Sequence, residues 1–293
     1  MSRFQFIQAQ KAAYPIALVC RVLAVSRAGY YAWVRRGPAA RTRADGELAE
    51  RIRQVHAQSR ATYGAPRIHA ELAATACRVG RKRVARLMRQ AGLAGCARRR
   101  QIVRTTVTDP EALPAPNVVA RQFAVPALDR LWVGDITYVP TVEGWLYLAV
   151  LLDACSRRVV GWAMADHLRT ELALEALQMA VRLRRPTPGC LLHHTDRGCQ
   201  YTAAVYRAAL ADRAITCSMS RAGNCYDNAL AESFFGSLKA ELLDRQVWPT
   251  RAAARQAIFE WIEVFYNRQR RHSALDFLSP AAFEGRWAEG HAA

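Results

Sequence analysis

The stretch LWVGDITYVPTVEGWLYLAVLLD, residues 131–153, decides the fold class of this chain. Its first ten residues alternate as in a strand, which places Asp135 on the same face as Val133 and Val139. The apolar run that follows predicts a second, more deeply buried strand. RRVVGWAMA, residues 157–165, predicts a third. Because the connections are short, we expect an antiparallel meander.

Beyond residue 165 the pattern alternates between helices and short strands. The predicted helices cover residues 168–184, 202–212, 225–244 and 250–267, and the predicted strands cover residues 190–196 and 215–220. Three strands, a helix, a strand, a helix, a strand and then helices is the order of a ribonuclease H-like domain. We therefore predict an α/β fold in which helices cover both faces of a mixed five-stranded sheet.

The region before this domain is predicted to be all-α. LVCRVLAVSRAGYYAW, residues 18–33, is typical of a helix, a turn and a second helix capped by Ser26. Further helices are expected over residues 45–58 and within YGAPRIHAELAA, where Pro66 lies in the first turn. VGRKRVARLMRQAGL, residues 79–93, predicts a helix with an apolar seam and a basic opposite face. Such a helix suits the recognition element of a helix-turn-helix.

Positive charge is concentrated in the first third of the chain. The formal net charge is +18, and residues 1–110 carry 22 Lys+Arg against 5 Asp+Glu, whereas residues 111–293 carry 20 against 19. Arginine supplies nearly all of the excess, and its guanidinium favours bidentate phosphate contacts. We expect a polyanionic partner such as nucleic acid or an acidic membrane surface, because a basic surface kept for solubility would not stop at one boundary.

The basic helix over residues 79–93 is the main predicted DNA contact. Its predicted DNA-binding residues are Arg81, Lys82, Arg83, Arg86 and Arg89. The alternative is an ordinary surface helix with its charges in solvent. We favour DNA contact because these basic residues face no nearby acidic partner in the sequence.

Residues 97–123 contain three prolines, many charges and little helical periodicity, so they predict a linker. The expected organisation is a helical DNA-binding region over residues 1–96, this linker, and a catalytic domain with its tail over residues 124–285.

Several other classes of protein are disfavoured by the sequence. The apolar run over residues 14–25 is too short to span a bilayer and is interrupted by Arg21, so no membrane partner is expected. The eight cysteines contain no C-x-x-C pair, which argues against a zinc module or a disulfide framework. Cys190, His193, His194 and Cys199 cluster in sequence, but adjacent histidines in a strand point to opposite faces. A cytoplasmic protein fits best.

Three acidic residues are candidates for catalysis. Asp135 lies inside an apolar strand, where a carboxylate is costly unless it is paired or metal-bound. Asp196 ends the strand over residues 190–196, in a turn where Gly198 lets the chain bend. If the first and fourth strands pair, the two carboxylates lie roughly 5 Å apart, which calls for a hard divalent cation between them. Glu232 lies on a predicted helix with Lys239 two turns later on the same face.

Other acids compete for these roles. They are Asp153, Asp166, Glu175, Asp227 and Glu241. Asp153 ends a strand and could pair with Arg157 or Arg158, and Asp227 suits the amino-terminal end of a helix. Each of the three candidates, taken alone, could equally serve as a cap or lie on the surface, and Lys239 could be an exposed helix lysine.

Taken together, the three blocks WVGDITYVP, HTDRGCQY and NALAESFFGSLKAEL resemble the catalytic blocks of insertion-sequence transposases in the retroviral integrase superfamily. Asp196 and Glu232 are separated by 35 residues, as in the D-D-35-E pattern of that group, and Lys239 matches its basic partner. The likeness is closest to the second reading-frame product of the insertion-sequence-three group. It extends to CRVLAVSRAGYYAW and YGAPRIHAEL near the start and to YNRQRRHSAL near the end.

This resemblance implies a bacterial DNA transposase that cuts and joins strands with two Mg²⁺ ions, for which Mn²⁺ could substitute. Asp135 would bridge both ions, and Asp196 and Glu232 would each complete one site. Lys239 would contact the phosphate near the scissile bond of the double-stranded DNA. Arg270, Arg271 and His272 would either support DNA strands near the site or lie in a solvated turn. The resemblance also implies a nucleoid-associated homodimer or higher assembly on DNA. An upstream reading-frame product, fused or separate, is an expected partner, since the chain shows no sustained heptad run.

Two alternative functions share these features. A ribonuclease H-like nuclease without strand joining would use the same carboxylates, although it has less need of a large basic region. A DNA-binding repressor with an inactive catalytic domain would keep the basic region, although it has no need of three intact acids.

Overall fold

The structure is a computed structural model that describes residues 2–36, 39–97, 115–120, 122–123, 125–221 and 228–291. Most of the linker predicted over residues 97–123 lies outside these ranges. Asp227 and the start of the helix predicted over residues 225–244 also lie outside them.

A mixed five-stranded sheet forms the centre of the catalytic domain, as the sequence predicts. Its strands are β1 (Leu131–Thr141), β2 (Gly144–Asp153), β3 (Val159–Ala165), β4 (Leu192–Thr195) and β5 (Thr216–Met219). They lie in the order β3-β2-β1-β4-β5. The first three strands form the predicted antiparallel meander, and β4 runs parallel to both β1 and β5.

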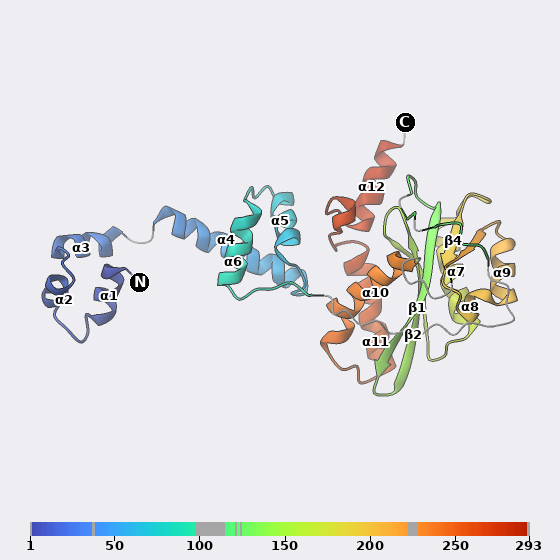
Figure 1. Ribbon diagram of the computed structural model, residues 1–293, viewed down its shortest axis with the longest axis horizontal. Coiled ribbons are helices and arrows are strands. Elements are labelled where there is room, and N and C mark those ends of the chain that lie inside the picture. Colours follow the sequence, from blue (N-terminus) through green and yellow to red (C-terminus); the bar gives the residue numbers. More distant parts are fainter. Residues whose placement is uncertain are drawn as a thin grey trace.

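Helices cover both faces of this sheet (Figure 1). One face packs against α7 (Thr170–Arg184), α8 (Cys199–Thr202) and α9 (Ala204–Ala211), and the other packs against α10 (Ala229–Glu241), α11 (Arg251–Phe259) and the π-helical turn Glu260–Tyr266. The alternation of β2 explains why two cores form. Leu148 and Val150 belong to the core beneath α10, whereas Ala149 and Leu151 belong to the core beneath α7.

A glycine allows α7 to lie unusually close to the sheet. A Cβ atom at Gly161 of β3 would lie 2.3 Å from the backbone oxygen of Ala176 in α7. The absence of a side chain at this position therefore sets the distance between helix and sheet.

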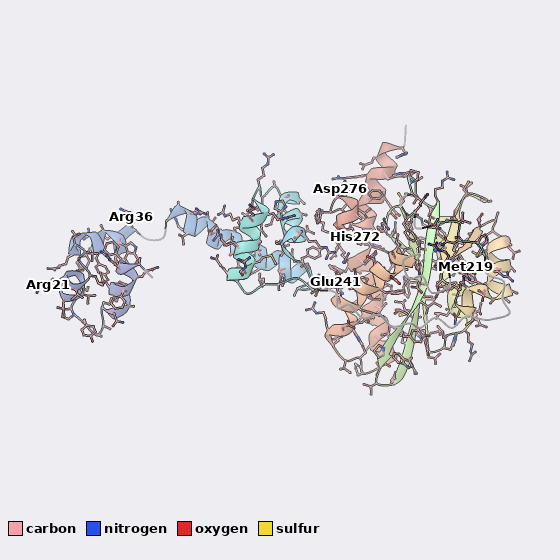
Figure 2. All side chains as sticks on the ribbon, in the orientation of Figure 1. Arg21, Arg36, Met219, Glu241, His272 and Asp276 are labelled. Carbon is pink, nitrogen blue, oxygen red and sulfur yellow. The ribbon has the colours of Figure 1, made fainter. Side chains whose placement is uncertain are left out.

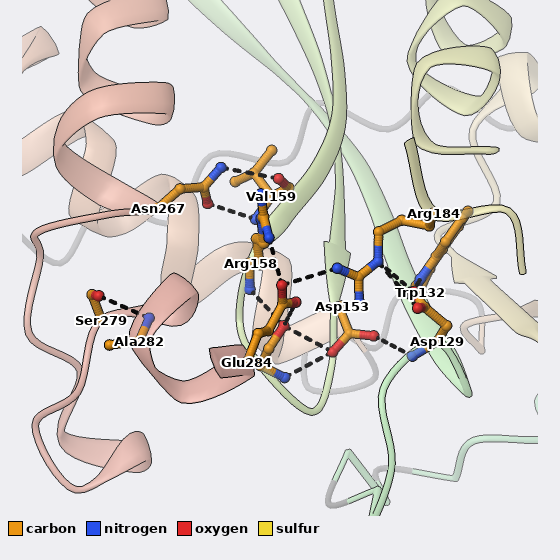
Figure 3. Close-up of polar contacts among 11 residues, drawn as sticks. Asp129, Trp132, Asp153, Arg158, Val159, Arg184, Asn267, Ser279, Ala282 and Glu284 are labelled. Carbon is orange, nitrogen blue, oxygen red and sulfur yellow. Dashed lines mark hydrogen bonds and ion pairs between the residues drawn. The ribbon is translucent and has the colours of Figure 1, made fainter. Parts of the chain in front are cut away.

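The carboxyl-terminal helix α12 (Pro280–Gly290) is fastened to the sheet by a polar network (Figure 3). Glu284 of α12 accepts hydrogen bonds from Arg158, Arg184 and Ser156, the last at 2.8 Å. Arg184, at the end of α7, also pairs with Asp129 at 2.8 Å. The tail is thus bound to two elements of the catalytic domain.

In the described part of the chain before the catalytic domain there are six helices, as expected for an all-α region. They are α1 (Arg3–Gln10), α2 (Ile16–Val22), α3 (Arg27–Arg36), α4 (Ala40–Gln58), α5 (Ala65–Ala74) and α6 (Arg81–Gln90). The predicted cap at Ser26 is confirmed, since Ser26 accepts a hydrogen bond from the Gly29 amide at 2.9 Å. Pro66 lies in the first turn of α5, as predicted. Val84, Leu87 and Met88 form the buried face of α6.

Within the residues that the structure describes, no helix has the length and apolar character needed to cross a membrane.

Candidate active site

Strand pairing brings Asp135 and Asp196 together. The parallel β1–β4 ladder pairs Leu131 with Leu192 and Val133 with His194. Continuing this register by two residues sets Asp135 beside Asp196, immediately after β4 ends. The expected pairing of the first and fourth strands is therefore confirmed. Because neighbouring strands lie about 4.8 Å apart, the two carboxyl groups are neighbours.

Asp196 is held in position by its own turn. Its Oδ1 accepts a hydrogen bond from the Gly198 amide at 3.0 Å, and the next residue, Arg197, donates to the Ser220 carbonyl at 2.7 Å. Gly198 has an ordinary φ of −61°. A Cβ atom there would lie 3.1 Å from Asp196 Oδ1. Gly198 therefore provides space beside the carboxylate, which corrects our expectation that it serves to bend the chain.

The surroundings of Asp135 strongly disfavour its ionised form. Its Oδ1 accepts a hydrogen bond from the Ile136 amide at 2.8 Å. Desolvation by the surrounding protein raises the pKa of Asp135 well above its ordinary value, and the charge of Asp196 and then that of Glu232 raise it further. Lys239 acts in the opposite direction and lowers the pKa of Asp135. The four side chains therefore form one electrostatic cluster.

Helix α10 delivers Glu232 and Lys239 to this cluster. Its buried side, which includes Phe234, Phe235 and Leu238, packs against the sheet and leaves Glu232 and Lys239 exposed. Glu232 lies in the first turn of α10, where the helix dipole favours a negative charge. Burial by neighbouring atoms nevertheless raises its pKa.

The donor set fits a hard divalent cation. The charges of Asp196 and Glu232 both disfavour the ionised form of Asp135, and a cation among the three carboxylates would relieve this repulsion. Carboxylate oxygen is the ligand that Mg²⁺ prefers. Among the described residues no three His, Cys, Asp or Glu side chains already enclose an ion-sized space.

The competing acids lie elsewhere. Asp153 is fully buried and accepts hydrogen bonds from the Asp129 amide at 2.8 Å and the Ser156 amide at 2.7 Å, which makes it a structural residue. The ion pair between Asp153 and Arg158 that the sequence suggested is not the one that forms, because Arg158 binds Glu284 instead. Asp166 and Glu175 are exposed, and Glu241 pairs with Arg270. Asp227 lies outside the described residues.

The sequence cluster at residues 190–199 is split by the fold, as expected for adjacent histidines in a strand. His193 Nε2 lies 2.8 Å from the Tyr206 hydroxyl, in the core beneath α7. His194 Nδ1 lies 2.9 Å from the Ser218 hydroxyl, and its ring packs against Phe123 on the opposite side.

Two residues of the basic helix have an acidic partner after all. Arg83 and Arg86 bind opposite oxygens of Asp45 on α4, at 2.6 and 2.7 Å. The expectation that the basic face of α6 has no acidic partner is therefore wrong for these two, because the fold brings α4 beside it. Both arginines lower the pKa of Asp45, Arg86 the more strongly. The other basic residues of this face are exposed: Arg81, Lys82 and Arg89.

The structure also corrects the expectation for Arg270. This residue is only 3% exposed, and its guanidinium binds both carboxylate oxygens of Glu241, at 2.7 and 2.6 Å. It therefore has a structural role against α10 and offers little surface to DNA. Arg271 binds Glu71 of α5 in the same bidentate way, at 2.9 and 2.8 Å, and so joins the tail to the helical region.

The chain is similar to known protein families and to individual proteins over most of its length. Two family models described as integrase core domain match residues 126–225 and 213–280, and one described as HTH-like domain matches residues 43–101. The chain is 45% identical to an insertion element IS600 31 kDa protein of Shigella sonnei, over 92% of this chain and 98% of that protein. It is 40% identical to the transposase InsF for insertion sequence IS3A of Escherichia coli strain K12, over 97% and 99%.

A solved structure, the simian T-cell lymphotropic virus intasome in complex with PP2A regulatory subunit B56 gamma, is similar with a TM-score of 0.45 and 16% identity. The similarity covers 78% of this chain and 74% of that chain.

Proposed function

The chain belongs to the IS3 family of insertion-sequence transposases with an integrase core domain, and on this premise we propose that it cuts and joins DNA strands in a metal-dependent reaction. One observation carries the proposal. The β1–β4 register sets Asp135 beside Asp196, and the charges of Asp196 and Glu232 both act on Asp135. Such a cluster is poorly suited to a structural role and well suited to holding cations.

Asp135, Asp196 and Glu232 are the proposed ligands of two Mg²⁺ ions, with Mn²⁺ as a substitute. Asp135, the central member of the cluster, would contact both ions, and the other two acids would each complete one site. When bound, the ions supply activation of water or a DNA 3′-hydroxyl and stabilisation of the leaving 3′-oxygen. Asp196 is preoriented for its role by the Gly198 amide.

Lys239 is the proposed contact for the phosphate near the scissile bond. It is exposed, lies on the same helix as Glu232, and is close enough to affect the pKa of Asp135. A lysine here would hold the phosphate as a point charge.

The basic face of α6 is the proposed DNA contact of the HTH-like domain. Arg81, Lys82 and Arg89 are exposed on this face, whereas Arg83 and Arg86 form ion pairs with Asp45. We keep Arg83 and Arg86 as secondary contacts, since each guanidinium has donors beyond those that Asp45 accepts. Arg271 is proposed to affect DNA binding only indirectly, because it binds Glu71 of α5 and so positions the HTH-like domain.

The test is nicking and strand transfer on a duplex oligonucleotide that carries the element's own end. Native protein with Mg²⁺ is compared with Asp196→Asn, Glu232→Gln and, as a matched control, Asp212→Asn, an exposed acid at the end of α9. We expect both reactions to be lost in the two site variants and kept in the control. Full activity of Asp196→Asn would refute the proposed site.

The same assay separates the alternative functions. Cleavage without joining would identify a nuclease. Tight binding of the end with neither reaction, in the chain fused to its upstream reading-frame product, would identify a repressor.

The proposed setting is a dimer or higher assembly on DNA in the bacterial cytoplasm, associated with the nucleoid. We also propose that the upstream reading-frame product contributes to end recognition and pairing. The proposed division of the chain remains residues 1–96, 97–123 and 124–285. Assembly of paired ends and their integration at full rate by this chain alone would contradict the need for an upstream partner.

A further inference from the structure

The first three helices form a small unit with its own core. Ile7, Val19, Cys20 and Tyr30 are buried together, and the neighbouring apolar side chains of Phe4 and Trp33, among others, pack around them. Figure 1 shows α1, α2 and α3 as a separate group at the amino-terminal end. The matched HTH-like domain begins only at residue 43, so the comparisons assign no role to this unit.

The connection between α2 and α3 is a tight turn fixed at both ends. At the end of α2, the Ala24 amide donates to the Arg21 carbonyl and the Val25 amide donates to the Cys20 carbonyl, and Ala24 has a φ of 51°. This pair of hydrogen bonds is the Schellman motif, with its left-handed residue at Ala24. Ser26 then caps α3. The turn therefore defines how α3 crosses α2.

The start of α3 also packs closely on its surroundings. A Cβ atom at Gly29 would lie 2.8 Å from Ser26 Oγ and 3.5 Å from the ring of Phe4 in α1. Tyr30 is 2% exposed, and its hydroxyl donates to Gln8 at 2.6 Å. Two helices joined by a short turn and braced by a third are the elements of a helix-turn-helix, in which the second helix recognises DNA.

The outer face of α3 has the composition that this role needs. Arg27, Tyr31 and Arg35 are exposed at intervals of four residues, and so form one stripe along the exposed side of α3. Residues 2–36 contain six basic residues and no Asp or Glu. Figure 2 labels two of them, Arg21 and Arg36. A unit with charge of one sign only is complementary to a polyanion along its whole surface.

We infer that α1–α3 is a second double-stranded DNA-binding unit that inserts α3 into the major groove. This inference rests on the proposed function for its partner, DNA, and adds a separate site of contact. Arg27, at the amino-terminal end of α3, is placed to read a base edge, where a guanidinium favours guanine. Arg35 and Arg36, at the other end, are placed for phosphates. The chain then reads a two-part sequence, one part with α3 and the other with α6.

The exposed apolar side chains of Leu18 and Val22 on α2 suggest a different occupant, a second copy of the chain. We favour DNA because the unit has no acidic residue with which a second copy could match its six basic ones. Binding of a second copy is nevertheless an outcome that the experiment must detect.

The experiment selects bound duplexes from a pool with a randomised central region, using the full chain without divalent metal. Arg27→Ala/Tyr31→Ala is compared with Arg3→Ala/Lys11→Ala, which changes two exposed basic residues of the same unit that do not belong to α3. We expect the first variant to lose base preference in one part of the selected sequence, keep the other part, and bind the native sequence about tenfold to a hundredfold more weakly. The control should keep both parts and show only a shallower salt dependence.

A third variant, Arg27→Lys, retains the charge but not the bidentate geometry, so it should relax base preference with little loss of nonspecific binding. Selection of the same complete sequence by all variants would overturn the inference. So would a change in sedimentation of the first variant with an unchanged selected sequence, which would assign the surface to a second copy. If the native chain selects no duplex at all, the proposed DNA partner itself fails, and that result is distinct from the other two.

Discussion

Replacing Asp135 with asparagine should make the metal-free protein more stable at neutral pH while abolishing activity. The β1–β4 register, continued by two residues, sets Asp135 beside Asp196, and neighbouring strands lie about 5 Å apart. Two like charges at that distance repel by about 3 kcal/mol at an effective dielectric constant of ~20. Both groups are only half-buried, so solvent screening reduces this to about 1–2 kcal/mol. The Asp135→Asn substitution would remove the repulsion and keep a side chain of similar shape.

The gain should depend on pH in a defined direction. The folded protein holds the pKa of Asp135 well above its ordinary value of 3.8, so it binds the proton more tightly than the unfolded chain does. A group whose pKa is higher in the folded state stabilises that state when it is protonated. This stabilisation is complete below the pKa of the unfolded chain and is lost as pH rises through the pKa of the folded protein. The native protein is therefore penalised at neutral pH, and the advantage of Asp135→Asn should shrink as pH falls toward 4.

Metal should reverse the order of stability. A cation that binds only the folded state raises the free energy of unfolding in proportion to the logarithm of its concentration. Thermal unfolding is measured with and without Mg²⁺ for native protein, Asp135→Asn and the exposed control Asp212→Asn. Native protein and control should gain stability with Mg²⁺, and Asp135→Asn should gain little. A metal-free Asp135→Asn that is less stable than native protein at pH 7, or equally stabilised by Mg²⁺, would refute the reasoning.

Three further changes test the framework that holds the site. Glu284→Gln leaves two partly buried arginines without their shared charge and should lower the free energy of unfolding by about 2–4 kcal/mol, measured by denaturant titration of the catalytic-domain transition. Burial lowers the pKa of His193 from 6.5 to about 4, so stability should fall as pH drops from about 6.5 to 4, and His193→Gln should flatten that part of the acid stability profile. Gly161→Ala places a Cβ 2.3 Å from a backbone oxygen of α7 and should cost about 1–3 kcal/mol or more by thermal unfolding, whereas the matched control Gly285→Ala, in α12 with nothing within 4 Å of the added Cβ and no positive φ, should cause no loss.

Local patterns were sufficient to predict the strands and the central pair of acids. The alternation around Asp135 placed it on a half-buried face, and the run before Asp196 identified a strand that could lie beside it. These features follow from the two-residue period of a strand and from the short range of turn signals. The cap at Ser26 and the first-turn position of Pro66 were predictable for the same reason.

Contacts between distant segments were not predictable in this way. Asp45 lies 38 residues before Arg83, and nothing in the local pattern of α6 indicates that α4 brings a carboxylate to its basic face. Gly198 was identified as a special position, but its physical reason, the space beside Asp196, depends on side-chain geometry. An arginine that has no acidic neighbour in the sequence can still form an ion pair in the fold, as Arg83 and Arg86 do with Asp45.

The tail segment YNRQRRHSAL shows the consequence of this limit for the active site. Its two adjacent arginines diverge, so that Arg270 holds Glu241 at the end of α10, and Arg271 holds Glu71 on α5. Figure 2 labels Glu241 and His272 on the side of the catalytic domain that faces the helical region. Arg67 of α5 also reaches Glu241, at 3.5 Å. Since α10 carries Glu232 and Lys239, the helix that completes the carboxylate cluster is held by the same residues that dock the HTH-like domain. A basic motif that suggests DNA contact is thus better explained as the joint that sets the catalytic helix relative to the DNA-binding region.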